Sequence, residues 1–269
     1  MITIDTIAVS ADLLWLNRNN QVLLNGGGLL GHRSSTAAAF IIPMPGSDSL
    51  YYLFTTDGLE NNLANGLRYS IIDMCLANGR GGIIQGRKNI QLLDMVSEKM
   101  TAVNHANGRD IWLVTHKYRS DAFYAYLITE NGISPPVISN VGSVHQRPNN
   151  DSYAAIGQMK ASPNGTRLAV AVSNIQPSKL ELFDFYKSTG VVNNVRSLNV
   201  GNVTYSVEFS PNASKLYASG DNKIYQYDLS AGDPVDINNS RKVIADTYGT
   251  MQLGPDGKIY VAMPAYIGV

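Results

Sequence analysis

The four histidines are the side chains of this chain best suited to proton transfer or metal binding. They are His32, His105, His116 and His145. None lies at the tight spacing of a metal motif such as His-x-Glu. His105 and His116 flank Asn107-Gly108, a strong hairpin signal that would put them at opposite ends of two paired strands. At 3.4 Å per residue the two rings would be roughly 20 Å apart, which excludes a shared metal ion.

A second set of polar residues falls on segments that are expected to be inner β-strands. Glu208 lies in the alternating segment 203–209, and three amides take comparable places: Asn104, Gln158 and Gln252. Carboxylate and amide oxygens are ligands that calcium accepts, so a calcium ion in a central channel is one alternative. The other alternative is a set of polar side chains that line a wet channel. One carboxylate among amides is a weak set of calcium ligands, so we assign no metal ligand, no cofactor and no catalytic residue from the sequence.

Three copies of a short turn motif show which elements must position these residues. The copies are Ser162-Pro163-Asn164-Gly165, Ser210-Pro211-Asn212-Ala213 and Gly254-Pro255-Asp256-Gly257. The spacing of their prolines, between 40 and 50 residues, is typical of a β-propeller, in which each blade is a four-stranded antiparallel sheet. The sequence therefore predicts an all-β fold of this architecture.

Four whole blades follow from alternating apolar segments that are separated by turn residues. The expected strands are 36–42, 50–56, 67–74 and 83–93; 100–105, 110–116, 122–129 and 136–141; 153–161, 167–173, 179–185 and 194–200; and 203–209, 215–219, 223–229 and 241–245. Segments 248–253 and 258–263 give the inner half of a further blade, and 13–18 and 21–24 give an outer half.

The two half blades leave the closure of the ring open. If strand 13–18 pairs with strand 258–263, the halves join and five blades close the ring. In the alternative, the chain is a fragment of a larger ring, with strand edges that a native protein normally protects. Residues 14–269 are expected to form a single propeller domain. Residues 1–13 do not fit the repeat and are expected to be an atypical N-terminal segment.

The blade register predicts one rim that collects several polar residues. His116 leads into a loop between second and third strands, whereas His32 and His145 lie in connections between blades. In a propeller both kinds of loop lie on the same face. We therefore expect a ligand face lined by His32, Asp57, His116 and His145, with Glu60 beside it; the alternative is that these are ordinary solvated loop residues.

Three further residues are expected to be structural. Cys75 follows an apolar strand and is predicted to be a small buried side chain. Asp184 and Asp228 each end a third strand, where an aspartate readily caps a turn.

The composition excludes several classes of partner. The chain has 269 residues, with 21 Lys and Arg against 21 Asp and Glu, so its net charge is zero. This balance gives no basic footprint for nucleic acid. The sequence contains no stretch of about 20 apolar residues, which is the length that a membrane-spanning helix needs. The single cysteine excludes an internal disulfide, and the first residues lack the pattern of a signal peptide.

Several motifs in a fixed order carry a resemblance to a known family. They are 15–22, 28–31, 98–108, 139–145, 159–165, 181–192 and 253–262. Together they resemble secreted propeller proteins of Bacteroidetes-type bacteria that are associated with gliding motility and type IX secretion. The resemblance implies an incomplete propeller that would have six or seven blades when whole. It also implies an extracellular or cell-surface location and a role in adhesion or glycan binding, and it supplies no catalytic residues. The later motifs are generic and also resemble WD-like and lactonase-like propellers.

Three functions therefore remain as alternatives. The first is a non-enzymatic binding or adhesion module that uses one propeller face for a protein or a glycan. The second is a calcium-dependent propeller hydrolase or lyase of the lactonase type, which would use Glu208. The third is an intracellular WD-like scaffold, although the chain lacks repeated Gly-His and Trp-Asp pairs.

Overall fold

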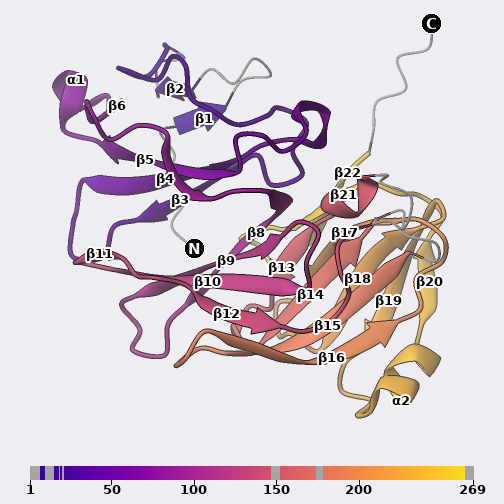
Figure 1. The fold of residues 1–269 in the computed structure, drawn as a ribbon. Helices are drawn as coiled ribbons and strands as arrows, with labels where there is room; N and C mark the ends of the chain where they lie inside the picture. Colours follow the sequence, from indigo (N-terminus) through magenta and orange to yellow (C-terminus); the bar gives the residue numbers. More distant parts are fainter. Residues whose placement is uncertain are drawn as a thin grey trace, which may run out of the picture.

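The sequence repeat folds into antiparallel β-sheets that follow one another in chain order (Figure 1). The computed structural model describes residues 7–9, 15–17, 19, 21–146, 152–173 and 178–263. Four sheets have four or five strands and two sheets have two strands. Neighbouring sheets meet through their inner strands, where β8 contacts β13 and β17 contacts both β13 and β21. The predicted all-β propeller fold is confirmed.

The first and second blades carry an outer edge that is split into two short strands. The first blade contains β3 (Ala39–Pro43), β4 (Leu50–Thr56), β5 (Leu67–Asp73), β6 (Gly82–Ile83) and β7 (Ile90–Leu93), with η1 (Leu59–Asn61) and α1 (Leu76–Gly79) in its connections. The second contains β8 (Val96–Asn104), β9 (Ile111–Lys117), β10 (Ala122–Thr129), β11 (Gly132–Ile133) and β12 (Val137–Asn140). The predicted single strand 83–93 is wrong, because a turn in which Arg87 N–H donates to the Ile84 carbonyl (3.0 Å) interrupts it.

The third and fourth blades each have four strands, but the predicted strand 153–161 is wrong in its first half, where the chain forms a 3-10 helix. After η2 (Ser152–Ala155), the third blade contains β13 (Met159–Ala161), β14 (Arg167–Val172), β15 (Lys179–Tyr186) and β16 (Val191–Leu198). The fourth contains β17 (Thr204–Phe209), β18 (Lys215–Gly220), β19 (Lys223–Asp228) and β20 (Lys242–Ala245). The helix α2 (Pro234–Asn239) was not predicted, although Asp233 is a good N-cap: its carboxylate accepts from Val235 N–H at 2.8 Å.

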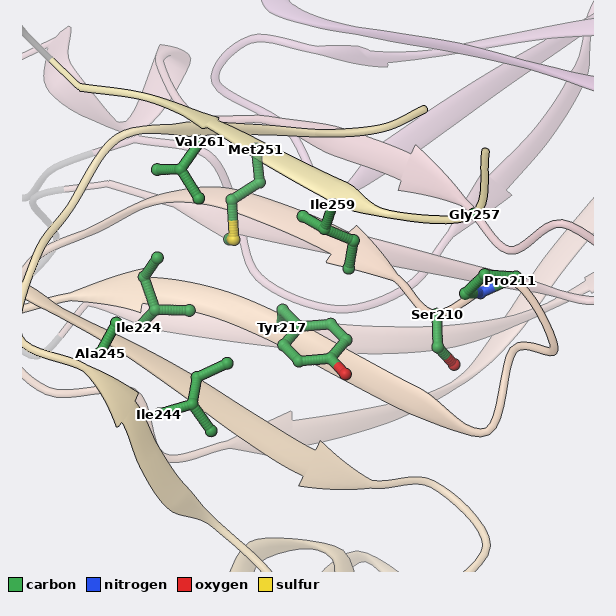
Figure 2. Close-up of a pocket in the computed structure, with 10 residues that line it drawn as sticks. All are labelled: Ser210, Pro211, Tyr217, Ile224, Ile244, Ala245, Met251, Gly257, Ile259 and Val261. Atoms are coloured by element: carbon green, nitrogen blue, oxygen red, sulfur yellow. The ribbon is translucent and has the colours of Figure 1, made fainter. Parts of the chain in front are cut away.

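The last two strands form a hairpin that packs against the fourth blade. β21 (Thr250–Leu253) pairs with β22 (Ile259–Ala262). Met251, Ile259 and Val261 of this hairpin share one apolar groove with Tyr217 and Ile224 of the fourth blade (Figure 2). The hairpin is the predicted inner half of a blade.

The first two strands pair differently from the prediction. β2 (Trp15–Asn17) forms a ladder with β1 (Ile7–Val9). Its contact with segment 21–24 includes the Asn17 N–H, which donates to the Gln21 carbonyl at 2.8 Å, and Leu24 of that segment makes a parallel bridge to Gly82 of the first blade. Among the described residues no ladder joins β2 to β22, so the alternative in which this pairing closes five blades has no support in this part of the chain. Pairing of β2 with β1 closes only a short loop, which costs less chain entropy than a pairing across the whole sequence.

The turn motif is a small hydrogen-bonded unit that recurs with the same geometry. Ser162 Oγ accepts from Arg167 N–H at 3.0 Å and donates to Asn164 Oδ1 at 2.7 Å. In the next copy, Ser210 accepts from Lys215 N–H at 2.9 Å and donates to Asn212 at 2.8 Å. The motif therefore closes each inner hairpin by local contacts alone.

One copy of the turn has a residue that is unfavourable for its conformation. Ala213 has φ +57°, whereas Gly165, which takes the same place in the first copy of the turn, has φ +70°. A left-handed conformation costs a non-glycine residue roughly 1–2 kcal/mol. Glycine avoids this cost, but it makes the unfolded chain more flexible, and this entropy cancels part of the gain in stability. We expect Ala213→Gly to stabilise the protein by about 0.5–1 kcal/mol in urea unfolding. The matched change Gly165→Ala should destabilise it, because the new Cβ would lie 2.8 Å from Val103 Cγ1. Equal stability of all three proteins would contradict this reading of the turn.

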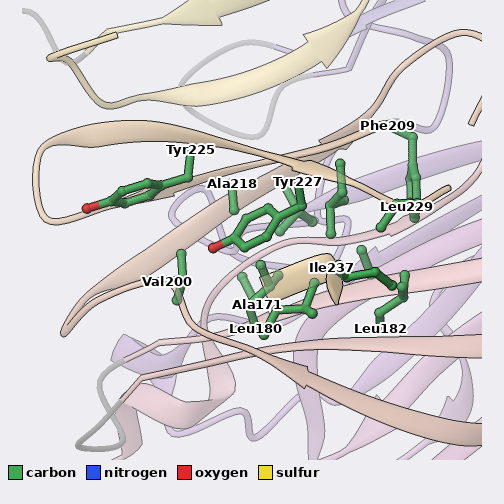
Figure 3. Packing of buried hydrophobic residues seen from close by; sticks show 14 residues of the cluster. Ala171, Leu180, Leu182, Val200, Phe209, Ala218, Tyr225, Tyr227, Leu229 and Ile237 are labelled. Atoms are coloured by element: carbon green, nitrogen blue, oxygen red, sulfur yellow. The ribbon is translucent and has the colours of Figure 1, made fainter. Parts of the chain in front are cut away.

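The apolar core lies between the blades. Between the third and fourth blades, Leu180 and Leu182 of β15 lie in one buried cluster with Tyr225 and Tyr227 of β19 (Figure 3). Tyr227 is fully buried and its hydroxyl donates to the Asn199 carbonyl. The third strand of one blade thus packs over the third strand of the preceding blade. Each blade therefore needs its neighbour to bury its apolar face.

Candidate functional site

The structure brings two of the predicted rim histidines together and buries them. His116 and His145 stack with ring centroids 3.4 Å apart and an angle of 18° between the rings. Their residues are 0% and 1% exposed, so the prediction that they line a rim is wrong. The cause is local: Arg119 N–H donates to the His145 carbonyl (3.3 Å) and His145 N–H donates to the Ser120 carbonyl (3.0 Å), which draws the blade connection over the rings.

The stacked rings are short of polar partners. Both ring nitrogens of His116 lack a hydrogen-bond partner among the described residues, and so does Nδ1 of His145. Burial and, as a smaller cause, repulsion from the nearby Lys99 lower the pKa of His116 to about 3. Burial also lowers the pKa of His145 well below its ordinary value, with added repulsion from His116, Lys99 and Lys179. Both imidazoles are therefore neutral at pH 7.

A buried lysine that the sequence analysis missed lies beside this pair. Lys99 is 0% exposed, and its Nζ donates to the carbonyls of Ala154 (3.1 Å), Ala155 (2.9 Å) and Ile156 (2.6 Å). Burial lowers the pKa of Lys99 to about 7, while the carboxylates of Glu98 and Glu181 oppose that shift. The predicted strand began one residue too late to include Lys99, since β8 begins at Val96.

The carboxylates around this cluster already have partners. Glu98 accepts from Thr36 N–H (2.7 Å) and Oγ1 (2.9 Å) and from Leu59 N–H (2.8 Å), which joins the first blade to the second. Glu181 accepts from Ser143 Oγ at 2.6 Å. Both side chains are therefore structural acceptors between segments that are distant in the sequence.

The remaining rim candidates separate. Asp57 is fully buried and accepts from Gly58 N–H (3.0 Å) and Asn65 N–H (2.7 Å), so it orders its own loop and does not line a surface. His32 stays partly exposed, with Nδ1 2.7 Å from Ser34 Oγ and 3.7 Å from Glu60 Oε2. Of the four predicted ligand-face residues, only His32 reaches solvent.

Of the four predicted channel residues, Glu208 and Gln252 lie together around one lysine, whereas the other two lie apart from them. The shared turn geometry places Lys160, Glu208 and Gln252 at one equivalent position of successive inner strands. Lys160 Nζ lies 3.3 Å from Glu208 Oε2 and donates to Gln252 Oε1 at 2.6 Å. Comparing the turn copies two residues before Ser162 would have found Lys160, so the signal was present in the sequence.

The two other channel candidates lie apart from this group. Gln158 Oε1 accepts from Ser206 Oγ at 2.6 Å and from Val207 N–H at 3.2 Å, which joins the third blade to the fourth. Asn104 is exposed and lies one residue out of register with Glu208, so its side chain belongs to the other side of its strand.

Side chains of the inner strands join each blade to the next through backbone N–H groups. Thr101 Oγ1 accepts from Ala161 N–H at 3.2 Å, Ser206 Oγ from Met251 N–H at 2.7 Å, and Glu208 Oε2 from Leu253 N–H at 3.0 Å. In the described part of the chain, no three His, Cys, Asp or Glu side chains come together as a metal site. The chemistry of this central region is therefore blade-to-blade hydrogen bonding.

Three predicted structural residues also have definite places. Cys75 is exposed, because it begins a turn after β5 and does not continue the strand, so its predicted burial is wrong. Asp184 forms two bonds of 2.9 Å with the Arg196 guanidinium. Asp228 lies 2.6 Å from Lys215 Nζ and also accepts from Ser230 N–H at 3.0 Å.

An open hollow lies where the connection into the second blade meets the β9–β10 turn. Its volume is about 750 Å³. The lining includes apolar, aromatic and charged side chains: Asp94, Lys117, Arg119, Tyr124, Ile138 and Asn140. Tyr118 N–H donates to the Met95 carbonyl at 2.8 Å, which holds the two loops together. Sequence reasoning missed this hollow because its residues come from separate strands and connections.

The described residues include no helix that is long and apolar enough to span a membrane. No protein-family model and no curated protein matches the chain. Similarity is found to solved structures. One is a "putative 6-phosphogluconolactonase" of Bacteroides fragilis, with TM-score 0.50, 12% identity, and coverage of 89% of this chain and 63% of that one. Another is hydrazine synthase of Kuenenia stuttgartiensis, with TM-score 0.50, 11% identity, and coverage of 98% and 97%. A third is the Swd1 β-propeller domain of Myceliophteria thermophila, with TM-score 0.49, 11% identity, and coverage of 84% and 65%.

The chain spans about 63% of the length of the Bacteroides fragilis protein and of a protein of the same description from Bacteroides uniformis. At 11–12% identity the likeness extends to the fold and not to an activity. The successive antiparallel sheets show that the described chain has the fold of a β-propeller, and the two neighbours with a TM-score of 0.50 agree with this fold.

Proposed function

We propose that this chain is a non-enzymatic binding module that takes a glycan or a protein on the propeller face where the β9–β10 turn meets the blade connections. The observation that carries the proposal is the open hollow of about 750 Å³ on that face. A ligand site of this kind combines apolar and aromatic surface with a few polar groups that orient the ligand.

The lining of the hollow fits a carbohydrate. Tyr124 and the half-exposed Ile138 offer apolar surface, while Lys117 and Asp94 are paired at 3.4 Å and stay accessible. Arg119 lies over the Tyr118 ring at 5.6 Å. Such a surface can stack on the apolar face of a sugar ring and bond its hydroxyl groups.

The alternative of a calcium-dependent hydrolase has less support. Both carboxylate oxygens of Glu208 are occupied, one by Phe209 N–H (2.9 Å) and one by Leu253 N–H (3.0 Å). The Lys160 ammonium at 3.3 Å supplies the positive charge that a cation would bring. The name of the Bacteroides fragilis protein refers to lactonase chemistry, but its likeness to this chain extends to the fold alone.

We also propose that the module acts outside the cell or on its surface. Support comes from the ordered motifs 15–22, 98–108 and 253–262, which resemble secreted propellers.

A glycan array with the full chain tests the proposed function. We expect binding to a defined group of glycans, and we expect Tyr124→Ala to weaken it at least about tenfold, the effect of a central contact residue. Tyr186→Ala is the matched control, because Tyr186 is an exposed tyrosine (48%) outside the hollow. Protein ligands that are lost on Tyr124→Ala would support the binding role with a different ligand class. No ligand of either class, or equal binding by both variants, would overturn it.

A further inference from the structure

The hollow proposed as a glycan site contains one cation that no carboxylate neutralises. Of its charged lining residues, two are basic and one is acidic, so the surface carries a net positive charge. Lys117 Nζ lies 3.4 Å from Asp94 Oδ1, which neutralises that pair. The exposed Arg119 guanidinium forms no ion pair with any carboxylate in the described part of the chain. Arg119 is therefore the charge that is left for a ligand.

The main chain holds Arg119 in one place beside the hollow. Arg119 N–H donates to the His145 carbonyl at 3.3 Å, and the preceding Tyr118 N–H donates to the Met95 carbonyl at 2.8 Å. Arg119 has φ +58° and Met95 has φ +43°, a backbone conformation that is unfavourable for a residue with a side chain. Glycine would adopt it more easily. Strain of this kind at an exposed arginine points to a contact with a ligand.

The guanidinium also has a preferred orientation. Its central carbon lies 5.6 Å from the centroid of the Tyr118 ring. Tyr118 is only 6% exposed, so its ring is a fixed support. A guanidinium that rests against an aromatic ring keeps its fork of N–H groups available, and the N–H groups of Arg119 donate to no other side chain or carbonyl of the described residues. The fork is thus positioned before a ligand arrives.

The other lining groups fit the rest of a sugar. Asn140 Nδ2 donates to Asp121 Oδ1 at 2.9 Å, which leaves the Asn140 amide oxygen to accept from a hydroxyl group. Tyr124 and Ile138 supply apolar surface. The hollow therefore offers an apolar surface, a hydroxyl acceptor and an unpaired cation, and a sugar acid carries the complement of all three.

We propose that the hollow recognises glycans through a sugar carboxylate, as in a uronic or sialic acid, which forms a bidentate pair with the Arg119 guanidinium. This inference rests on the proposed function and names its ligand class. The planar fork of an arginine matches the two oxygens of a carboxylate, and such charge-assisted bonds are the stronger ones. Lys117 does not compete for the carboxylate, because Asp94 already holds its ammonium.

Ligand pairs that differ only in charge test the proposal. The full chain is titrated by calorimetry with oligogalacturonate, oligomannuronate and sialyllactose, each as the free acid and as its methyl ester. The ester keeps the sugar ring and its hydroxyl groups but removes the negative charge. We expect at least one free acid to bind and its ester to bind at least about tenfold more weakly, the effect of losing hydrogen bonds to a charged group.

Protein variants assign the effect to one side chain. Arg119→Met should reduce binding of the acid to the level of the ester and leave binding of the ester unchanged, whereas Arg119→Lys should keep part of the difference. Arg241→Met is the matched control, because Arg241 also lies over a tyrosine, at 4.9 Å from the Tyr225 ring, but outside the hollow. Asp94→Asn removes the acidic lining residue and should tighten binding of the acid about two- to fivefold.

The outcomes separate this inference from the proposed function. Glycan binding with no preference for the acid over the ester, or with full affinity for the acid in Arg119→Met, would overturn the inference and leave the glycan site standing. Sulfated lactose that binds as tightly as sialyllactose would show a general anion site and overturn the carboxylate assignment. Absence of every glycan would overturn both. If the Arg119 variants unfold in circular dichroism, the comparison of acid and ester on the unaltered protein decides.

Discussion

Lys99→Met is expected to lower the free energy of unfolding by about 1–3 kcal/mol, the usual cost when buried acceptors lose their hydrogen-bond donor. Methionine has nearly the length of lysine but donates no hydrogen bond. The carbonyls of Ala154, Ala155 and Ile156 would lose their common donor in the interior. The connection into the third blade would then lose its contact with β8.

Urea unfolding followed by tryptophan fluorescence at pH 7 measures this effect. Lys117→Met is the matched control, because Lys117 is 34% exposed and pairs with Asp94 at the surface. Exposed ion pairs contribute about 0–1 kcal/mol, so the control should change little. A loss below about 1 kcal/mol in Lys99→Met would show that the three carbonyls find other partners and that the ammonium is not essential to this contact.

The stacked histidines predict a loss of stability in mild acid. The pKa of His116 in the folded protein is about 3, and burial lowers that of His145 as well, whereas an unfolded histidine titrates near 6.5. The stabilisation is therefore complete above pH 6.5 and is lost as the pH falls toward the folded values, since only the unfolded chain takes up the protons. Two such groups should lower the free energy of unfolding by about 2.5 kcal/mol between pH 7 and pH 5.5.

Urea unfolding as a function of pH checks this expectation. Replacing both rings, as His116→Phe with His145→Phe, should remove most of the pH dependence in this window. Lys99 adds little there, because it is protonated in both states below its folded pKa of about 7. His105→Gln is the control, since that ring lies half-buried in a surface turn. A wild-type protein with constant stability down to pH 5.5 would contradict the neutral, buried state of the pair.

The blades could be predicted because their signals are local. The Ser162 and Ser210 turns close on residues five positions away, and strands such as β19 alternate at period two. Both patterns lie within a short stretch of sequence and need no knowledge of distant neighbours. The exceptions were also local: the turn that splits β6 from β7, and the helix α2 that begins after Asp233.

The site was harder to predict, because burial depends on elements that are far apart in the sequence. His116 was placed at the end of a second strand and His145 in a blade connection, but the main-chain bonds of Arg119 and Ser120 to His145 decide that the rings are enclosed. Lys99 meets three carbonyls more than 50 residues away. A carboxylate such as Glu208 could be placed on an inner strand, but not its partner, which belongs to another blade.

The sequence by itself determined the repeat, the blades, the neutral charge balance and the absence of metal motifs, since each follows from residue type and spacing along the chain. The tertiary structure alone decided which polar groups meet, which are buried and where open surface remains. The reason is physical: adjacent blades contact side by side, so each inner strand completes its hydrogen bonds and buries its apolar face only against a strand about 45 residues away in the repeat. His116 and His145 are therefore interior residues of the blade packing, and the hollow is part of the accessible surface.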